Sequence, residues 1–157
     1  MRVRFKGPAN ALRILPALFL VFTLVACIPV STAPNTARVS RVIDGDTVVL
    51  SSGEHVRYIG VDTPEMDPFE PFAQAATDAN RALVEGKTVR LEKDTSETDR
   101  YGRLLRYVWV GDTMVNLELV KSGLAEAKAY PPDVRYQQQL DAAEDQAKES
   151  GLGMWGR

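Results

Sequence analysis

The chain has 157 residues, enough for one domain with its own hydrophobic core and too few for two catalytic domains. Hydrophobic residues make up 45% of the sequence and charged residues 25%, which excludes a largely disordered chain and a protein with several membrane spans. With one cysteine and one histidine, the chain has neither the cysteines for an internal disulfide nor the histidine pair of a zinc site.

The N-terminus has the pattern of an export signal. Four basic residues precede or open an apolar run over residues 14–26, which is short for a bilayer span and ends at Cys27. The segment Leu24-Val25-Ala26-Cys27 resembles the lipobox of bacterial lipoproteins. We therefore predict a lipoprotein signal peptide over residues 1–26, lipidation of Cys27, and an extracytoplasmic protein anchored to a membrane of the cell envelope. The alternatives are a plain signal peptide, which predicts a secreted protein, and an uncleaved anchor helix.

The segment after the signal peptide separates the anchor from the folded part. Residues 28–37 are rich in Pro, Ser, Thr, Ala and Asn, so Cys27 and these residues form a predicted flexible tether over 27–37. The domain is placed at residues 38–157. Without residues 1–26 the chain keeps 15 basic and 21 acidic residues, a formal charge of −6. Such a domain can attract nucleic acid only through a local cluster of positive charge.

The first half of the domain has the pattern of strands followed by one helix. Residues 39–50 contain β-branched and apolar residues around an Asp-Gly pair, and a turn at 51–53 separates them from a second strand-like run, 55–61. The single histidine, His55, is expected on the solvent side of that strand. A helix is predicted over 71–85, closed by Gly86. Its expected apolar stripe consists of Phe72, Ala75, Ala76, Ala79 and Leu83.

The second half adds two strands and two helices. Strands are predicted over 87–93 and 104–110, and helices over 116–122 and 134–150, each helix followed by a glycine. The last helix has an expected apolar stripe of Tyr136, Leu140, Ala143 and Ala147. The order lacks the regular strand-helix alternation of a parallel sheet, so an α+β fold is predicted. About five short strands suit a small closed barrel of the oligonucleotide/oligosaccharide-binding (OB) type, although periodicity alone also allows a sandwich.

Two short segments concentrate carboxylates. Asp44 and Asp46 lie on either side of Gly45, which we expect to adopt a conformation that other residues avoid and so to turn Asp46 inward. Asp62 and Glu65 flank the Thr63-Pro64 pair at the end of a predicted strand. Oxygen ligands from Asp46, Asp62 and a carbonyl near Thr63 suit Ca²⁺ or Mg²⁺. Glu65 is left to take a proton from water.

A third segment, Asp99-Arg100-Tyr101-Gly102-Arg103, places two guanidinium groups around a glycine turn. Guanidinium groups bind phosphate oxygens in a bidentate way and stabilise the additional charge of a five-coordinate phosphorus. Each of the three segments is common by itself: Asp-Gly and Tyr-Gly-Arg occur in β-turns, and Thr-Pro-Glu begins turns or helices. Their combination predicts a phosphodiesterase.

The same segments carry a family resemblance. Residues 42–48, 61–65 and 98–103 resemble the three signature regions of the thermonuclease (staphylococcal nuclease-like) family, and the similarity extends through 114–116 and 123–125 to the terminal Gly-Met-Trp. The resemblance implies a five-stranded OB barrel with about three helices. It also implies a Ca²⁺-dependent endonuclease that uses one Ca²⁺ to hydrolyse DNA or RNA at the 5′ P–O bond and leaves 3′-phosphate products.

The resemblance also assigns roles to individual residues. Asp46, Asp62 and the carbonyl of Thr63 match the calcium ligands. Glu65 matches the general base. Arg57 and Arg103 match the two arginines that hold the phosphate and stabilise the transition state.

Other residues near the site receive less specific roles. Asp44 either hydrogen-bonds the calcium surroundings or is simply a turn residue. Arg100, Tyr101 and Tyr130 are expected to contact the substrate, Tyr130 by stacking, although the family pattern has two tyrosines where this chain has one. The segment 66–71, after Glu65, contains two acidic residues and two prolines.

The protein is expected to be a monomer. The alternative function is that of a non-catalytic OB-fold lipoprotein that binds nucleic acid or another polymer.

Overall fold

The computed structural model describes residues 35–156. The predicted signal peptide, Cys27 and most of the tether therefore lie outside the described residues. No helix within residues 35–156 is long and apolar enough to cross a membrane. The first strand begins at Thr36 rather than after the predicted domain start at Arg38, because Thr36 and Ala37 already pair with a neighbouring strand.

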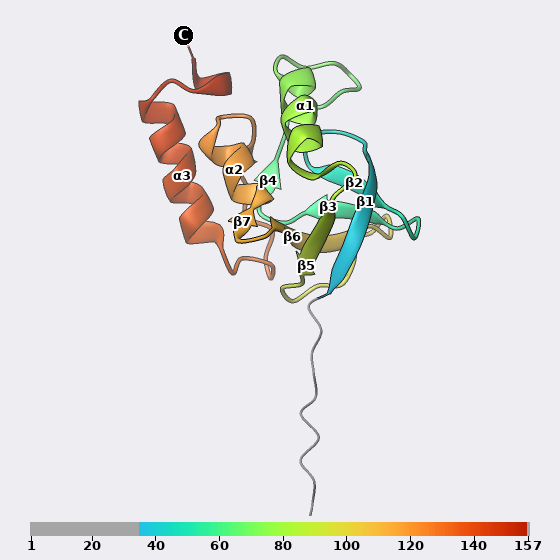
Figure 1. The fold of residues 1–157 in the computed structure, drawn as a ribbon. Coiled ribbons are helices and arrows are strands. Elements are labelled where there is room, and N and C mark those ends of the chain that lie inside the picture. The colour runs from blue at the N-terminus through green and yellow to red at the C-terminus, as the bar shows by residue number, and fades with distance from the viewer. Residues whose placement is uncertain (1–34, 157) are drawn as a thin grey trace, which may run out of the picture. The chain divides into compact units, whose positions relative to one another are not determined.

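Five strands form the closed barrel that the sequence predicts (Figure 1). They are β1 (Thr36–Val42), β2 (Thr47–Leu50), β3 (His55–Tyr58), β5 (Thr88–Glu92) and β6 (Leu104–Val110). The pairs β1–β2, β2–β3, β1–β5 and β5–β6 are antiparallel, and a parallel pairing of β3 with β6 closes the barrel. The α+β fold of OB type is confirmed, and the sandwich alternative is excluded.

Buried valines from all five strands form much of the core of the barrel. Val39, Val48, Val56, Val89 and Val108 have at most 1% of their surface exposed. β-Branched residues fit the pleated surface of a strand, and burying each valine stabilises the fold by roughly 1.5–3 kcal/mol. His55, in contrast, is exposed as predicted.

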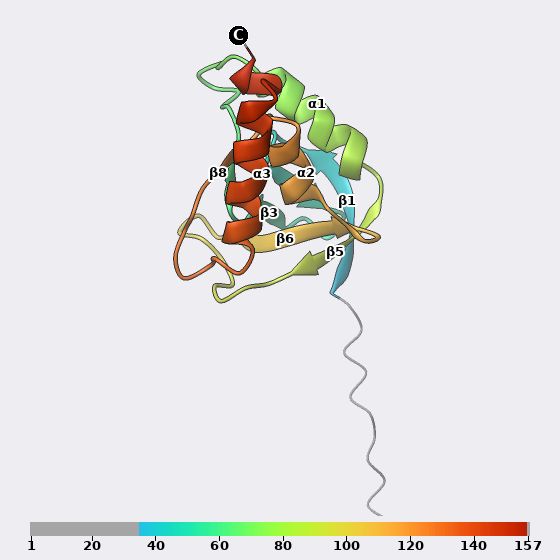
Figure 2. The same cartoon turned by 90° about the vertical axis from the view of Figure 1, so that its left-hand side faces the viewer.

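Three α-helices and one short 3-10 helix complete the domain (Figures 1 and 2). They are α1 (Ala73–Val84), α2 (Val115–Lys121), α3 (Gln137–Glu149) and η1 (Gly153–Trp155). Helices α2 and α3 pack against each other beside the barrel, whereas α1 contacts β1 and α2. Helix α1 begins after Phe72, whose left-handed backbone (φ 68°) prevents the helix from starting at Pro71 as predicted. Helix α3 likewise begins at Gln137, later than predicted.

The buried face of α1 differs from the predicted stripe. Phe72 and Ala75 are exposed. Of the predicted stripe, Ala76 is buried, and Ala79 and Leu83 are half-buried. The other buried residues of the helix are Ala73, Thr77, Asn80 and Val84. Two of these are polar, and both are satisfied by hydrogen bonds, because the Thr77 hydroxyl donates to the carbonyl of Ala73 at 2.9 Å and Asn80 bonds to the barrel. A pattern of apolar residues cannot reveal a face of this kind. The stripe predicted on α3 is confirmed at its three helical members, since Leu140, Ala143 and Ala147 are buried.

The predicted strand 55–61 is interrupted at Gly60. Gly60 has φ +78°, and a Cβ there would lie 2.5 Å from a methyl group of Leu140. The chain leaves the barrel at this point and forms β4 (Val61–Asp62), which pairs antiparallel with β8 (Glu126–Ala127). The short strand β7 (Thr113–Met114) pairs with the end of β6. The interruption at Gly60 therefore places Asp62 outside the barrel, next to β8.

Candidate active site

Two carboxylates converge on the guanidinium group of Arg57. Its Nη1 lies 2.8 Å from Oδ2 of Asp46, and its Nη2 lies 2.8 Å from Oδ1 of Asp62. Nη1 also donates to the carbonyl oxygens of Val61 at 2.9 Å and Tyr58 at 3.1 Å. The side chain of Arg57 is only 12% exposed, so these four acceptors hold the group at one place. Because Arg57 is on β3 and Asp46 directly precedes β2, the β2–β3 pairing brings the two residues together.

Asp46 is enclosed by hydrogen-bond donors. Its Oδ2 accepts the backbone N–H of Thr63 at 3.0 Å and the Thr63 hydroxyl at 3.1 Å, while its Oδ1 accepts the Thr47 hydroxyl at 3.1 Å. Burial raises the pKa of Asp46 to about 6, although the positive charge of Arg57 acts in the opposite direction. The structure thus joins the first carboxylate segment to Thr63 of the second.

Gly45 permits this junction for a reason that differs from the predicted one. Its φ is not positive, so the expectation of an unusual conformation was wrong. A Cβ at Gly45 would instead lie 2.7 Å from the side chain of Thr63, which leaves no room for any other residue. Asp44 fits its turn role, because its Oδ1 accepts the backbone N–H of Asp46 at 3.1 Å. In addition, the side-chain amide of Asn80 donates to the carbonyl of Asp44 at 3.0 Å.

Asp62 has a second cationic neighbour that sequence reasoning missed. The Nζ of Lys128 lies 2.5 Å from Oδ2 of Asp62, and this hydrogen bond raises the pKa of Lys128. Lys128 follows β8, so the β4–β8 pairing makes the contact. No feature of the sequence signals that pairing, because both strands are only two residues long.

Glu65 lies in an exposed segment after Thr63 and Pro64. Its backbone is held by Glu70: the N–H of Glu65 donates to Oε2 of Glu70 at 2.9 Å, and the carbonyl of Glu65 accepts the N–H of Glu70 at 2.9 Å. Among residues 35–156 the Glu65 carboxylate has no hydrogen bond or salt bridge of its own. It is therefore accessible to water.

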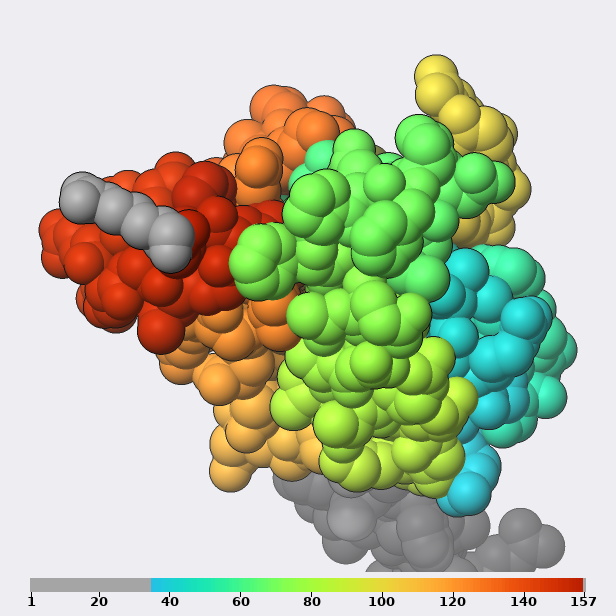
Figure 3. Space-filling view, turned by 90° about the horizontal axis from the view of Figure 1, so that it is seen from above, coloured from blue at the N-terminus to red at the C-terminus, as the bar shows by residue number. Residues whose placement is uncertain are grey.

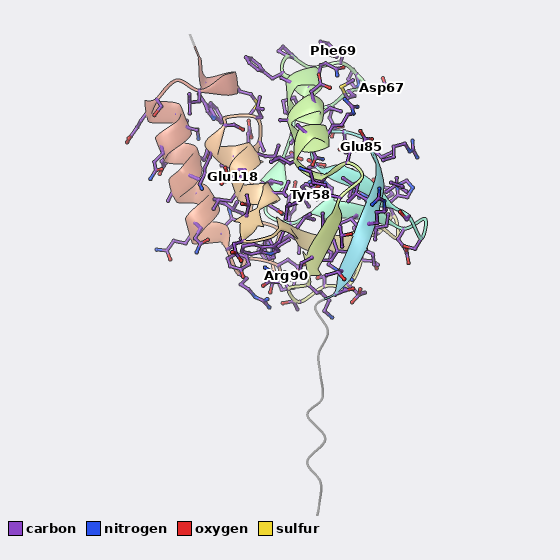
Figure 4. All side chains as sticks on the ribbon, viewed as in Figure 1. Tyr58, Asp67, Phe69, Glu85, Arg90 and Glu118 are labelled. Atoms are coloured by element: carbon purple, nitrogen blue, oxygen red, sulfur yellow. The ribbon has the colours of Figure 1, made fainter. Side chains whose placement is uncertain are left out.

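Segment 66–72 is the most exposed apolar feature near these carboxylates. The side chains of Met66, Phe69 and Phe72 are 36%, 67% and 43% exposed. Figure 3 shows this segment, in green, beside α1 on the face seen from above. Figure 4 shows Asp67 and Phe69 at the outer end of the segment, well away from Tyr58 in the interior.

Arg103 is positioned by Asp99, a residue to which the sequence analysis gave no role. Oδ2 of Asp99 accepts the Nε–H of Arg103 at 2.7 Å, and Oδ1 accepts the backbone N–H groups of Arg103 and Tyr101 at 3.0 and 2.9 Å. Although burial opposes the change, these hydrogen bonds lower the pKa of Asp99. Gly102, with φ +80°, allows the chain to turn back so that one carboxylate can bind both ends of the segment.

The two arginines of the predicted site face a common pocket. This pocket has a volume of about 350 Å³, and its lining includes Arg57, Arg103, Asp99, Tyr130 and Asp133. Asp133 accepts backbone N–H groups of Thr95 and Ser96 at 2.9 and 2.7 Å and so holds Ser96, another lining residue, in place. The structure therefore brings Arg57, Arg103 and Tyr130 together.

Asp62 and Thr63 line a neighbouring pocket of about 400 Å³, together with Glu70, Phe72, Glu126 and Met154. The pair between Arg57 and Asp62 connects the two pockets.

Arg100 and Tyr101 line neither pocket. They form an exposed pair, with the guanidinium carbon of Arg100 4.7 Å from the centre of the Tyr101 ring and Tyr101 67% exposed. The guanidinium carbon of Arg103 lies 5.5 Å from the same ring. The pair is thus at the edge of the arginine pocket.

The residues present fit a hard divalent cation. Within residues 35–156 no three His, Cys, Asp or Glu side chains are grouped to hold a metal ion, whereas the predicted set needs only two carboxylates and the Thr63 carbonyl. Asp46 and Asp62 both form an ion pair with Arg57, so their carboxylates lie near each other. Carboxylate oxygens are the ligands that Ca²⁺ and Mg²⁺ prefer. A cation would also offset the cost of a buried, ionised Asp46.

The fold and the site define a small OB barrel with a pocket of arginines and carboxylates. A family model described as "Staphylococcal nuclease homologue" matches residues 55–157. A thermonuclease of Staphylococcus intermedius is 44% identical over 126 residues, which cover 76% of this chain and 75% of the relative. A thermonuclease of Staphylococcus hyicus is 42% identical over 128 residues, which cover 77% and 76%. Endonuclease YncB of Bacillus subtilis (strain 168) is 39% identical over 126 residues, which cover 74% and 60%. The chain belongs to the staphylococcal nuclease family.

Proposed function

We propose that this protein is a Ca²⁺-dependent nuclease that hydrolyses phosphodiester bonds of DNA or RNA. Relatives with the names thermonuclease and endonuclease, at 39–44% identity over most of the chain, support a nuclease. The observation that carries the proposal is the convergence of Asp46 and Asp62 on Arg57, which shares a pocket with Arg103. This arrangement supports the proposal, because carboxylate oxygens that suit a cation lie beside two guanidinium groups that suit a phosphate.

Asp46, Asp62 and the carbonyl of Thr63 are the proposed ligands of one Ca²⁺. The bound ion supplies positive charge next to the phosphate, which lowers the energy of the more highly charged transition state. Asp46 is preorganised for this task, because Thr47 and Thr63 fix the orientation of its carboxylate. Asp44 supports it by accepting the N–H of Asp46.

Arg57 and Arg103 are the proposed phosphate-binding residues. Both line the same pocket, and each is held by carboxylates, Arg57 by Asp46 and Asp62 and Arg103 by Asp99. Guanidinium groups keep their charge at any physiological pH and match two phosphate oxygens at once. Tyr130 lines the same pocket, where a 42% exposed ring is available to a nucleotide base or sugar.

Glu65 is the proposed general base. Its exposed carboxylate takes a proton from a water molecule as the water oxygen forms a bond to phosphorus. The bond between phosphorus and the 5′ oxygen breaks, and the leaving oxygen takes its proton from solvent water. The products are a 3′-phosphate and a 5′-hydroxyl group.

The Glu65→Gln variant tests this function. We expect its turnover number on single-stranded DNA in Ca²⁺ to be roughly 10²–10⁴-fold lower than that of the wild type, because the amide cannot accept the proton. Glu118→Gln, a change of the same kind on α2 away from the site, is expected to keep wild-type turnover. Activity of Glu65→Gln near the wild-type level, or wild-type activity that persists in excess chelator, contradicts the mechanism. Nucleic-acid binding by the wild type without any cleavage would support the non-catalytic alternative.

The location of the protein is a separate proposal that rests on the sequence of residues 1–37. We propose that Cys27 carries a lipid and anchors a monomeric domain outside the cytoplasm, where Ca²⁺ is available. Metabolic labelling with a fatty-acid analogue tests the anchor. We expect the wild type to be labelled and Cys27→Ser to be unlabelled, whereas an unlabelled wild type would favour a secreted protein.

Light scattering of residues 28–157 measures the molar mass in solution and so tests whether the domain is a monomer.

A further inference from the structure

The pairing of β4 with β8 determines where the side chain of Lys128 lies. Val61 is opposite Ala127, and the N–H of Lys128 donates to the carbonyl of Gly60 at 2.9 Å. In this antiparallel register Lys128 is opposite Gly60, and so its side chain is on the same face of the ladder as Asp62. Gly60 has no side chain to separate them. The ammonium group therefore reaches the diagonal neighbour, with Nζ 2.5 Å from Oδ2 of Asp62.

The two cations on Asp62 differ in how firmly they are held. Arg57 is 12% exposed and bonds to two carboxylates and two carbonyl groups, so it is fixed in the interior. The Lys128 side chain is 49% exposed; its Nζ bonds to one carboxylate and lies 5.7 Å from the centre of the Tyr130 ring. A third charged group, Glu126, lies directly across from Asp62 in the same ladder. Lys128 is therefore the displaceable cation in a predominantly acidic ladder.

We infer that Lys128 is a built-in counter-ion of Asp62 that competes with the metal ion for this carboxylate and so lowers the Ca²⁺ affinity of the site. Oδ1 of Asp62 is taken by Arg57, which leaves Oδ2 as the oxygen for a cation. A Ca²⁺ that binds there must displace the ammonium group. The inference rests on the proposed function only in that Asp62 is a cation ligand.

An exposed ion pair of this kind contributes little to folding stability, so its effect is expected in cation binding rather than in unfolding. The direct test is a calorimetric titration with Ca²⁺ of the folded wild-type protein and of Lys128→Gln, without substrate. We expect the dissociation constant of the variant to be about fivefold lower, because a positive charge within several ångströms of a divalent ion is removed. Lys128→Arg keeps the charge and is expected to bind as the wild type does.

The chain provides a matched control in Lys121. Its side chain is also 49% exposed and pairs with one carboxylate, Glu118 at 2.8 Å, but it is on α2. Lys121→Gln changes the net charge equally and is expected to leave the dissociation constant unchanged. The difference between the two glutamine variants is expected to be smaller in 0.5 M salt, where the Debye length is about 4–5 Å. It is expected to be larger for Tb³⁺, because the repulsion increases with the charge of the ion.

The outcomes separate this inference from the proposed function. Wild-type binding of Ca²⁺ with equal dissociation constants for Lys128→Gln and Lys121→Gln overturns the role of Lys128 and leaves the nuclease proposal intact. Weaker binding by Lys128→Gln overturns it as well. A wild-type protein that does not bind Ca²⁺ at all overturns both. If Lys128→Gln unfolds at a lower temperature, Lys128→Ala repeats the comparison with a shorter side chain.

Discussion

Asp46 combines burial with a full set of hydrogen-bond donors. The residue is 5% exposed, and it accepts hydrogen bonds from Thr47 and Thr63 in addition to its ion pair with Arg57. Loss of water raises its pKa to about 6, above the ordinary value of 3.8 for an aspartate. The folded protein without metal therefore keeps the proton of this side chain up to a higher pH than the unfolded chain does, whereas cation binding needs the ionised form.

This shift predicts a pH dependence of stability. Between about pH 4 and pH 6 the folded state binds more protons at Asp46 than the unfolded state does, so stability falls as pH rises through this range. The stabilisation that Asp46 gives the folded state is complete at a pH below its pKa in the unfolded chain. It is lost at a pH above its pKa in the folded protein. We expect it to change the free energy of unfolding by up to about 3 kcal/mol between pH 4 and pH 7, as measured by urea denaturation in chelator.

Asp46→Asn isolates the effect, because the amide does not titrate. The other perturbed acids, such as Asp99, remain in both proteins and cancel when the two curves are subtracted. The difference in unfolding free energy between variant and wild type is expected to shift in favour of the variant as pH rises. A difference that is constant from pH 4 to pH 7 would show that the pKa of Asp46 is not raised.

Helix α1 is connected to the site by one buried amide. Asn80 is fully buried; its Oδ1 accepts the Tyr58 hydroxyl at 2.9 Å, and its Nδ2 donates to the carbonyl of Asp44 at 3.0 Å. The Tyr58 side chain, which is 1% exposed, lies inside the domain (Figure 4). The helix thereby supports both β3 and the turn that carries Asp46.

We predict that Asn80→Ala lowers the free energy of unfolding by about 2–4 kcal/mol. The change leaves the buried Tyr58 hydroxyl and the carbonyl of the half-buried Asp44 without their partner. Each unsatisfied buried group costs roughly 1–3 kcal/mol. Chemical denaturation measures the loss. Gln74→Ala, an exposed change on the same helix, is expected to stay within about 0.5 kcal/mol of the wild type. Adding Tyr58→Phe to Asn80→Ala removes the orphaned hydroxyl, so the double variant is expected to lose less than the sum of the single losses.

For the whole molecule, the important property is a net negative charge around a small positive site. Residues 27–157 have a formal charge of −6, and Arg57 and Arg103 are the two arginines of the pocket. The domain as a whole repels a polyanion, so attraction of nucleic acid depends on the pocket and on a bound cation. Affinity should therefore depend only weakly on salt.

This charge distribution predicts a shallow salt dependence of binding. Two phosphate contacts on a single strand give a slope of about −1.4 in a plot of log affinity against log salt. Fluorescence anisotropy of labelled single-stranded DNA with Glu65→Gln, in constant Ca²⁺, measures it without cleavage. Introducing Arg103→Gln into that protein is expected to reduce the slope by about 0.7. A slope of −4 or steeper would show that many more phosphates are contacted than the pocket can hold.

The fold class and the segments of the site can be predicted from local patterns in the sequence. Strand periodicity, the glycines after each helix and the order of elements predict an α+β fold, but they leave a barrel and a sandwich open. The family resemblance favours the closed barrel, which the structure confirms. These features are local, since propensity and periodicity act between residues near each other in the chain. The motifs around Asp46, Asp62 and Arg103 were found for the same reason, because each lies within a few residues of a recognisable turn.

The way in which these segments meet becomes visible in the folded domain alone. A glycine is needed at position 45 because the side chain of Thr63 fills the space that a Cβ would occupy. Asp46 is bound by Thr63 and Arg57. The ammonium group of Lys128 contacts Asp62, 66 positions earlier in the sequence. Asn80 on the buried face of α1 likewise bonds to residues distant in sequence, the Tyr58 hydroxyl and the carbonyl of Asp44. Contacts between distant residues have no period in the sequence, and they form only when barrel closure and the β4–β8 pairing bring the segments together.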